Sequence, residues 1–392
     1  MKNLITSLLL ALVLLPSVAL SAAEELSNHA LLELIKQLES RLEGEAPLHD
    51  SGRHAANAVW SSWAERATFS GLVEVEGVYE DVGFAGAGSD ESSDLTLATV
   101  ELGIDAEINE HVSGHMLLLW EEDYAEPIDV DEAFILLDGG DDAPVWLRAG
   151  KMYAPFGNFT SNMISDPLTL EIGEANESSV EFGARMGNFY ALAYAFNGDI
   201  DEAGDVNHMD NFGAQLGYIL EQELFSVDLG VSYINNLVDS DGWGDEFEDG
   251  EHELLHYVGG MAWHAVVEAG AFNFIGEYVC ALDDPEYLLG GNVEERDAIA
   301  VWNLEAGYTF TILNKTSLVA LAYQGSNNSD SFMPAGYSGE DEELDFIPQH
   351  RYMLSMGMEI FPCTSLALEY LHDEYADDDS ADILSAQLAL EF

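Results

Sequence analysis

Apolar and polar side chains alternate residue by residue in most of sixteen segments between residue 68 and the end of the chain, and poorly only in 129–138 and 188–197. In segment 299–312, for example, Leu304 and Ala306 fall on one face of an extended strand, and Asn303 and Glu305 fall on the other. Segments of about ten residues with one apolar and one polar face are typical of transmembrane β-barrels. The segments are 68–80, 93–107, 112–122, 129–138, 144–152, 178–187, 188–197, 210–220, 224–235, 254–265, 269–282, 299–312, 316–325, 349–361, 364–375 and 382–392.

The connections between these segments also alternate, short at every even position and mostly longer and acidic at the odd positions. Short turns at one rim and long loops at the other are typical of outer-membrane barrels. A soluble β-sandwich, the competing fold, gives no reason for this alternation. We therefore predict an all-β fold, a transmembrane antiparallel β-barrel of about sixteen strands over residues 68–392. The short connections are Ile108–His111, Gly139–Ala143, Gly187–Asn188, Glu221–Glu223, Val266–Glu268, Leu313–Lys315 and Pro362–Cys363.

Residues 1–23 have the pattern of a secretory signal peptide. Lys2 precedes a mainly apolar run over 4–20, and small residues follow, so cleavage is expected after Ala23. An uncleaved membrane anchor is the alternative, which Pro16 disfavours because it interrupts the run. No later segment has the roughly 18 successive apolar residues that a spanning helix needs. An exported membrane protein of this sequence is therefore expected to be a closed barrel, which leaves no backbone group unpaired in lipid.

Residues 24–46 are predicted to form a short helix outside the barrel. Leu31, Ile35, Leu38 and Leu42 are spaced four, three and four residues apart, as in the seam of a short coiled coil. One interpretation is a periplasmic oligomerisation helix, which would make the protein a homotrimer. The other is an amphipathic helix that lies on the periplasmic mouth of the barrel. Residues 47–67 would then form a linker.

The chain has 74 acidic and 11 basic residues, which give a formal net charge of -63. Nucleic acid is excluded as a partner, because its phosphates are bound through Lys and Arg. We expect outer-membrane lipid and lipopolysaccharide as partners, with Ca²⁺ or Mg²⁺ bound loosely at acidic loops; the alternative is an acidic surface that is only solvated. No catalytic or cofactor-binding motif is present, so we expect no enzyme activity and no cofactor. Cys280 and Cys363 should lie near opposite ends of the barrel, without a disulfide.

The last segment alternates apolar residues and ends on Phe392. This ending resembles the terminal-strand signal that the barrel-assembly machinery of Gram-negative bacteria reads. That machinery is therefore an expected partner during biogenesis.

The connection over 153–177 is the long loop with the most candidate functional residues. Cationic residues bracket it, although Lys and Arg are scarce in this chain. By analogy of fold, sixteen-strand porins place this loop in the lumen. We expect a constriction in which loop carboxylates face or pair with these cations; the alternative is a set of salt bridges that pins the loop to the wall. The predicted pore-lining residues are Arg148, Lys151, Asp166, Glu171, Glu174, Glu181 and Arg185.

Many other carboxylates should point into the barrel, according to the alternation of each strand. A lumen lined by one sign of charge concentrates ions of the opposite sign and repels the others. The sequence therefore predicts a preference for cations. The inward carboxylates are Glu74, Glu76, Glu101, Asp105, Glu277, Glu305 and Glu359.

Residues 150–159 read Gly-Lys-Met-Tyr-Ala-Pro-Phe-Gly-Asn-Phe, and residues 166–174 read Asp-Pro-Leu-Thr-Leu-Glu-Ile-Gly-Glu. This pair of motifs resembles the LbtU-type siderophore porin family. The resemblance implies an outer-membrane transporter for iron uptake in a Gram-negative bacterium, which passes an iron–siderophore complex without a large N-terminal plug. It also implies that the loop is shaped by Pro155, Phe156, Gly157, Asp166, Pro167 and Gly173. A general cation-selective porin, or an acidic structural barrel without a dedicated substrate, is the alternative.

Overall fold

The computed structural model describes residues 66–85, 88–122, 127–140, 143–204, 208–248, 252–329, 347–376 and 378–392. The chain divides into two units, 1–65 and 66–392. The predicted signal peptide, the predicted helix over 24–46 and almost all of the predicted linker lie outside the described residues.

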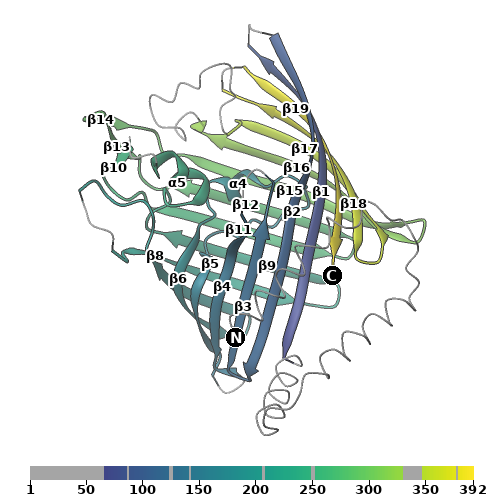
Figure 1. Ribbon diagram of the computed structural model, residues 1–392, viewed down its shortest axis with the longest axis horizontal. Helices are drawn as coiled ribbons and strands as arrows, with labels where there is room; N and C mark the ends of the chain where they lie inside the picture. Colours follow the sequence, from purple (N-terminus) through teal and green to yellow (C-terminus); the bar gives the residue numbers. More distant parts are fainter. Residues whose placement is uncertain are drawn as a thin grey trace, which may run out of the picture. The chain divides into compact units, whose positions relative to one another are not determined.

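Sixteen strands of the described chain form one closed antiparallel barrel, in which the last strand pairs with the first (Figure 1). This confirms the predicted fold class. The other described elements are not part of the barrel wall: a three-stranded sheet of β10 (His252–Leu254), β13 (Glu286–Leu289) and β14 (Asn292–Glu295), and the helices α4 (Leu168–Glu171) and α5 (Asp241–Glu248). The barrel strands are β1 (Ala67–Phe84), β2 (Gly88–Asn109), β3 (Val112–Trp120), β4 (Asp129–Asp138), β5 (Val145–Tyr153), β6 (Asn176–Met186), β7 (Phe189–Phe196), β8 (Asn211–Glu221), β9 (Phe225–Ile234), β11 (Gly260–Ala269), β12 (Phe272–Ala281), β15 (Ala300–Ile312), β16 (Lys315–Asn327), β17 (His350–Phe361), β18 (Thr364–Glu374) and β19 (Ser380–Glu391).

The alternation of side chains separates an apolar outer face from a polar inner face. On β15, Leu304 is 53% exposed on the outside, whereas Glu305 is 5% exposed on the inside. Paired residues of neighbouring strands share a face, so Ile275 of β12 and Ala322 of β16 point inward with Glu305. The outer face can therefore meet lipid while the inner face meets water or the long loops.

One predicted strand was placed wrongly. Segment 254–265 is not one strand, because β10 ends at Leu254 and the barrel strand β11 runs from Gly260 to Ala269. Leu254 and Val258 are buried among the long loops, each 1% exposed. Their burial in that loop cluster explains why an apolar stretch looked like the start of a wall strand. The turn that follows is at Gly270, whose φ of 62° suits a glycine.

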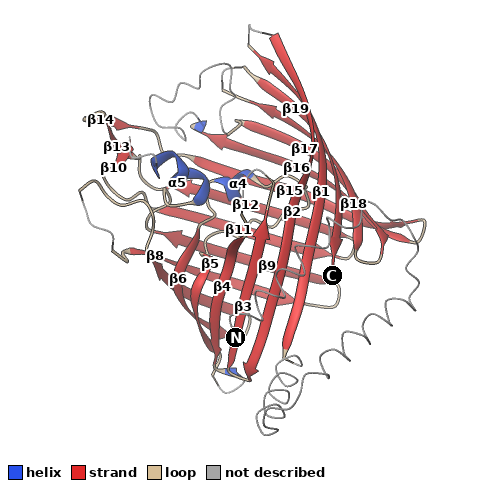
Figure 2. Cartoon of the chain, in the orientation of Figure 1, coloured by secondary structure: helices blue, strands red, loops and turns tan. Residues whose placement is uncertain are grey.

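The largest cluster of buried apolar side chains lies where the long loops meet the inner face of the wall, rather than in the wall itself. It includes Phe156, Leu168, Ile172, Ile200, Leu237, Val238, Trp243, Tyr287 and Ile299. Helix α4 contacts β12, β15, β16 and α5, and α5 contacts β10 (Figure 2). These loops therefore form a packed body against one side of the interior. Inner-face residues on that side, such as Tyr194 and Asn303, are buried, whereas Glu74 and Glu101 on the other side stay partly exposed.

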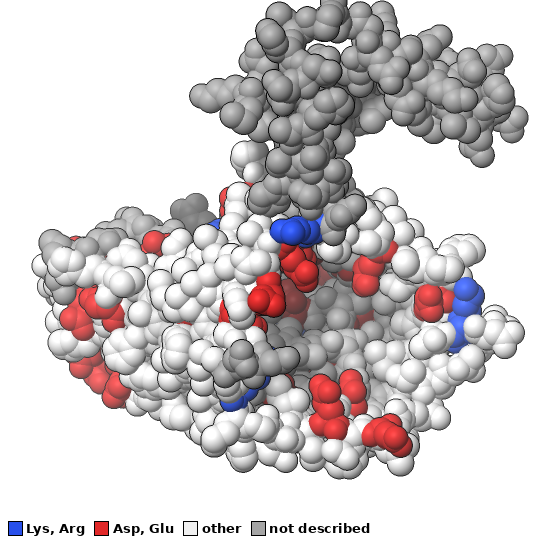
Figure 3. All heavy atoms as spheres, turned by 90° about the horizontal axis from the view of Figure 1, so that it is seen from below, with Lys and Arg blue, Asp and Glu red and all other residues white. Residues whose placement is uncertain are grey.

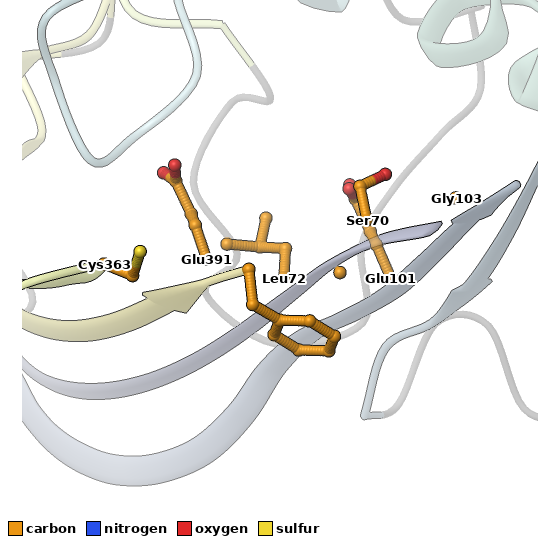
Figure 4. A pocket seen from close by; sticks show the side chains of 8 residues that line it. Ser70, Leu72, Glu101, Gly103, Cys363 and Glu391 are labelled. Atoms are coloured by element: carbon orange, nitrogen blue, oxygen red, sulfur yellow. The ribbon is translucent and has the colours of Figure 1, made fainter. Parts of the chain in front are cut away.

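The barrel closes where the end of the chain meets β1. Gly71 donates its backbone N–H to the carbonyl of Phe392 at 2.8 Å, and Phe392 donates back to Gly71 at 3.0 Å. A Cβ on Gly71 would lie 2.5 Å from the Phe392 ring, so only glycine leaves room for the ring there. Beside this seam, a cavity of about 430 Å³ is lined by Glu101 and Glu391, among others, whose side chains stand on the same side of the sheet (Figure 4).

None of the helices that the structure describes is long and apolar enough to cross a membrane. Cys280 on β12 and Cys363 in the turn after β17 are both free thiols.

Candidate functional site

The loop between β5 and β6 crosses the barrel interior and binds the opposite wall. Glu277 of β12 accepts hydrogen bonds from the backbone N–H groups of Asn158 and Phe159, at 2.6 and 3.1 Å, and from the hydroxyl of Thr169 at 2.9 Å. Because β12 is far from β5 and β6 in the strand order, the loop must reach across the lumen to make these bonds.

Two further wall carboxylates hold the middle of the loop. Glu305 of β15 accepts from the backbone and side-chain N–H groups of Asn162, at 2.8 and 2.9 Å, and from the Ser161 hydroxyl at 2.7 Å. Glu369 of β18 accepts from the backbone N–H of Ile164 at 2.6 Å and from the backbone and hydroxyl of Ser165 at 3.1 and 2.7 Å. Each carboxylate thus takes three bonds from the loop.

Neutral side chains complete the attachment. Ser232 of β9 accepts from the N–H of Gly157 at 2.9 Å, and Gln324 of β16 accepts from the N–H of Leu168 at 2.9 Å. Phe156 and Leu168 pack into the apolar cluster, each 1% exposed. The loop is therefore fixed to the wall from β9 to β18 by polar bonds and by apolar burial.

Glu277 and Glu305 have a different role from the one predicted. Both point inward, as the alternation indicates, but they are only 4% and 5% exposed. The loop covers them and uses both oxygens of each carboxylate as acceptors. They therefore anchor the loop and do not line water. Glu369, which the sequence analysis did not select, has the same role, and its inward position between Leu368 and Tyr370 was a readable signal.

The predicted pairing of loop carboxylates with the bracketing cations is wrong. Arg148 is directly opposite Glu181 in the register of β5 and β6 and binds it, with Nε to Oε1 at 3.0 Å. The guanidinium of Arg185 stacks over the Trp146 ring. These residues bracket the loop in sequence, but the loop leaves β5 for the far wall, so its carboxylates do not meet them.

Lys151 is not on the inner face. Lys151 is opposite Ala133 of β4 and Ser178 of β6. The next residues on the same face of those two strands are Ile135 and Val180, whose side chains are 58% and 44% exposed on the outside of the barrel. Its Nζ donates to the carbonyl of Val130 at 3.1 Å and lies 3.6 Å from Asp129. Lys151 therefore caps the start of β4 and does not line the predicted constriction.

The loop turns its other face to open water, and that face is acidic. Asp166 is exposed, and Glu171 and Glu174 are partly exposed. Arg351 of β17 is the cation that acts electrostatically on Asp166 and Glu171, and it is itself bound to Asp373 at 2.8 and 2.9 Å. Arg351 lies far along the chain from the loop, so no local sequence pattern connects the two.

A second acidic face, from β1 to β4, lies near the first. Asp166 interacts electrostatically with Glu76 of β1 and with Glu121 after β3. Glu101 interacts in turn with Glu121, Asp131 and Glu132. In Figure 3, Asp and Glu gather around and inside the hollow of the described molecule, whereas Lys and Arg appear in only a few places.

Asp131 and Glu132 were missed because a bulge disturbs the alternation of β4. The register of β3 and β4 shifts between Leu117 and Leu118, which pair with Glu132 and Val130. Asp131 is left over and accepts hydrogen bonds from Tyr153 and Asn176. A one-residue bulge reverses the facing of everything beyond it, so parity counted from one end of the strand fails at the other.

The predicted loop-shaping residues are in the tightest part of the loop. Gly157 has a φ of 76°, and a Cβ there would lie 2.4 Å from the ring of Phe159. A Cβ on Gly173 would lie 2.7 Å from the same ring. Pro167 directly precedes α4, and Pro155 directly precedes the buried Phe156. The two glycines therefore make room for Phe159.

The remaining inward carboxylates lie on the wall apart from the loop anchors. Glu76 accepts from the Gln387 side chain at 2.7 Å, and Asp105 contacts His115 at 2.7 Å. By register, Glu74 and Glu359 are also on the inner face. Within the described ranges, no three His, Cys, Asp or Glu side chains are arranged to hold a metal ion. Loose Ca²⁺ or Mg²⁺ binding stays a prediction.

The charge of the loop face should depend on pH. Burial, together with the neighbouring carboxylates of Asp241, Asp166 and Asp131, raises the pKa of Glu174 to about 8. Glu174 is then mostly neutral below that pH and becomes charged above it. If the loop face controls permeation, cation preference in a bilayer recording should increase between about pH 6 and about pH 9. In Glu174→Gln this increase should become smaller; an unchanged pH profile in the variant would contradict the assignment.

No protein-family model matches the chain. It is similar to a UPF0422 protein of Coxiella burnetii, with 28% identity over 317 residues, and to a UPF0422 protein of Legionella pneumophila, with 24% identity over 307 residues. These alignments cover 79% and 71% of this chain, but 64% and 54% of the relatives. The chain thus spans between about half and two thirds of the length of the curated relatives it matches. The resemblance to LbtU-type siderophore porins stays a prediction.

Several solved outer-membrane proteins share the fold. The channel DcaP of Acinetobacter baumannii aligns with a TM-score of 0.56 and 13% identity, over 83% of this chain and 97% of that one. OprB of Pseudomonas putida aligns with a TM-score of 0.57 and 10% identity, over 84% and 95%. OmpF of Salmonella typhi aligns with a TM-score of 0.54 and 12% identity, over 83% and 97%. At these identities the likeness shows the sixteen-strand porin fold.

Proposed function

We propose that this chain is an outer-membrane channel that passes cations and small cationic solutes along one side of its lumen. The porin fold supports the channel role. The packed loops and the anchored loop 153–177 fill the side between β7 and β18. The water path then runs between the acidic face of the loop and the acidic wall of β1 to β4.

The acidic lining on both sides of this path is the observation that carries the cation preference. Asp166 on the loop and Glu76 and Glu121 near the wall act on one another, so a cation that passes is attracted from both sides. Two unit charges 4 Å apart interact by about 1 kcal/mol even in bulk water, which corresponds to about a fivefold change in local ion concentration. Several such carboxylates should exclude anions effectively.

Reversal potentials of the purified protein in a planar bilayer test this proposal. In a KCl gradient around 0.1 M, we expect K⁺ to be at least about five times more permeant than Cl⁻. The preference should decrease in 1 M KCl, because the screening length falls from about 10 Å to about 3 Å. A reversal potential near zero, or of the sign for anions, would contradict the proposal.

Uptake of an iron–siderophore complex is a second candidate, favoured by the motifs over 150–174. The acidic path limits it to complexes without net negative charge, since a polyanionic complex would be repelled from both sides. A deletion strain grown on such complexes as its iron source tests this: a growth defect with neutral or cationic complexes supports the role. Normal growth with all of these complexes would rule out the role in iron uptake and leave only the function of a general cation channel.

A further inference from the structure

A cavity with different chemistry lies on the inner face of β4, β5 and β6, near the rim with the short turns. Its volume is about 520 Å³, and its lining includes Trp146, Arg148, Arg185, Leu136 and Asp138. Two guanidinium groups in one cavity are unusual in a chain with 11 basic residues in total. The cavity therefore differs from the acidic path and calls for a different ligand group.

A buried carboxylate holds two members of the cavity in place. Glu181 is fully buried, and it accepts from the Trp146 indole N–H and from Nε and Nη2 of Arg148. The Trp146 ring lies flat against Gly183, where a Cβ would be 2.0 Å from the ring. Trp146 and Arg148 are thus fixed before any ligand arrives, which lowers the entropic cost of binding.

The two guanidinium groups of the cavity keep N–H donors that can bind a ligand. The Cζ atom of the Arg185 guanidinium lies over the Trp146 ring, 5.3 Å from its centre, in a cation–π contact. Among the described residues, no carboxylate forms an ion pair with Arg185, and Nη1 of Arg148 has no hydrogen-bond partner. Asp138 also borders the cavity, but its carboxylate accepts the N–H of Gly140 at 2.7 Å.

We propose that Arg148, Arg185 and Trp146 form a subsite for the carboxylate end of a small solute whose other end is positively charged. The guanidinium edges bind the carboxylate, and Trp146 and Leu136 contact an apolar or aromatic body. The positive end is required because a free anion is repelled by the acidic path. This last requirement rests on the proposed function, whereas the binding of a carboxylate does not.

The position of Glu132 favours a ligand that has one positive and one negative end. It lies on the inner face of β4 and interacts electrostatically with Arg148, so an acidic group of the path and a cation of the cavity are neighbours on one wall. A solute with an ammonium group and a carboxylate can contact both at once. The channel would then favour zwitterionic over purely cationic aromatic solutes at this point.

Binding of three probes to the full chain in detergent tests the subsite: benzoate, 4-(aminomethyl)benzoate and benzylamine. We expect saturable calorimetric binding of both carboxylates to the unaltered protein. Arg185→Gln should weaken that binding about tenfold, as for the loss of a charge-assisted hydrogen bond, and leave benzylamine unaffected. Arg185 is suited to this test because it is exposed and pairs with no carboxylate among the described residues, so the barrel should still fold.

Arg296→Gln is the matched control, since Arg296 is bound to the Tyr287 hydroxyl in the long loops, away from the cavity. Absence of saturable carboxylate binding, or equal affinity in Arg185→Gln and the unaltered protein, would overturn the subsite. The two proposals can fail separately. Arg185-dependent binding without cation preference in the bilayer removes the proposed function alone, and cation preference without such binding removes the subsite alone.

Discussion

Replacing Glu277, Glu305 and Glu369 together with alanine is expected to increase the single-channel conductance severalfold. Each carboxylate accepts three hydrogen bonds from the loop. Hydrogen bonds to charged groups contribute about 1.5–3 kcal/mol each, so losing all nine removes at least as much free energy as the net stability of a typical domain. The part of the loop between Asn158 and Ser165 should then leave the far wall and open the lumen, while Phe156 and Leu168 stay packed in the apolar cluster. Each single replacement should have a smaller effect, because the other two anchors remain.

The control removes the same charge without touching the loop. Glu74 and Glu359 are on the inner face, and so is Glu107, which pairs with Ser113 on the same face as Asp105 and His115. Replacing these three with alanine should leave the conductance the same or lower, since fewer cations are attracted. Both triple variants should keep the heat-dependent migration of a folded barrel on a gel. Equal conductance in the anchor variant and the unaltered protein would show that these carboxylates do not hold the loop.

Changing Glu101, Glu132 and Asp166 to lysine should reverse the ion preference. These three carboxylates belong to the two faces of the proposed path. With about 1 kcal/mol for each charge at 4 Å in water, three reversals should lower the ratio of cation to anion permeability by at least about tenfold. The same positions changed to glutamine should give an intermediate ratio, measured from reversal potentials at 0.1 M KCl.

The matched control places three lysines at Asp283 and Asp284, in the connection after β12, and at Glu286, the first residue of β13; all three border another cavity. These residues are not among the charges that act on Asp166. At 0.1 M salt the screening length is about 10 Å, so their effect on the permeability ratio should stay within about twofold. A reversal by the loop lysines, or none by the path lysines, would place the selective part of the channel elsewhere.

The barrel was predictable from the sequence because each strand by itself needs apolar side chains toward lipid and polar side chains toward water. Leu304 and Glu305 differ in exposure as the alternation predicts, and no knowledge of distant contacts was needed. The prediction failed where an apolar stretch was buried by loops, as with Leu254 and Val258. Local pattern cannot distinguish burial against lipid from burial against another part of the chain.

The candidate site was only partly predictable. The alternation placed Glu277 and Glu305 on the inner face, but their bonds to the loop span 119 and 143 residues, which no local pattern reveals. For the same reason the sequence pattern suggested Arg148, which is near the loop along the chain, as the partner of the loop carboxylates, rather than Arg351. Nearness along the chain is a poor guide to pairing when a loop crosses the interior.

Seven backbone N–H groups between Gly157 and Leu168 attach the loop to wall side chains. A main-chain donor is present whichever side chain its residue carries, proline apart. The residues that project toward the water can therefore be exchanged while the loop keeps its position. This arrangement makes the loop a suitable place for redesigning which solutes pass, with the barrel left unaltered.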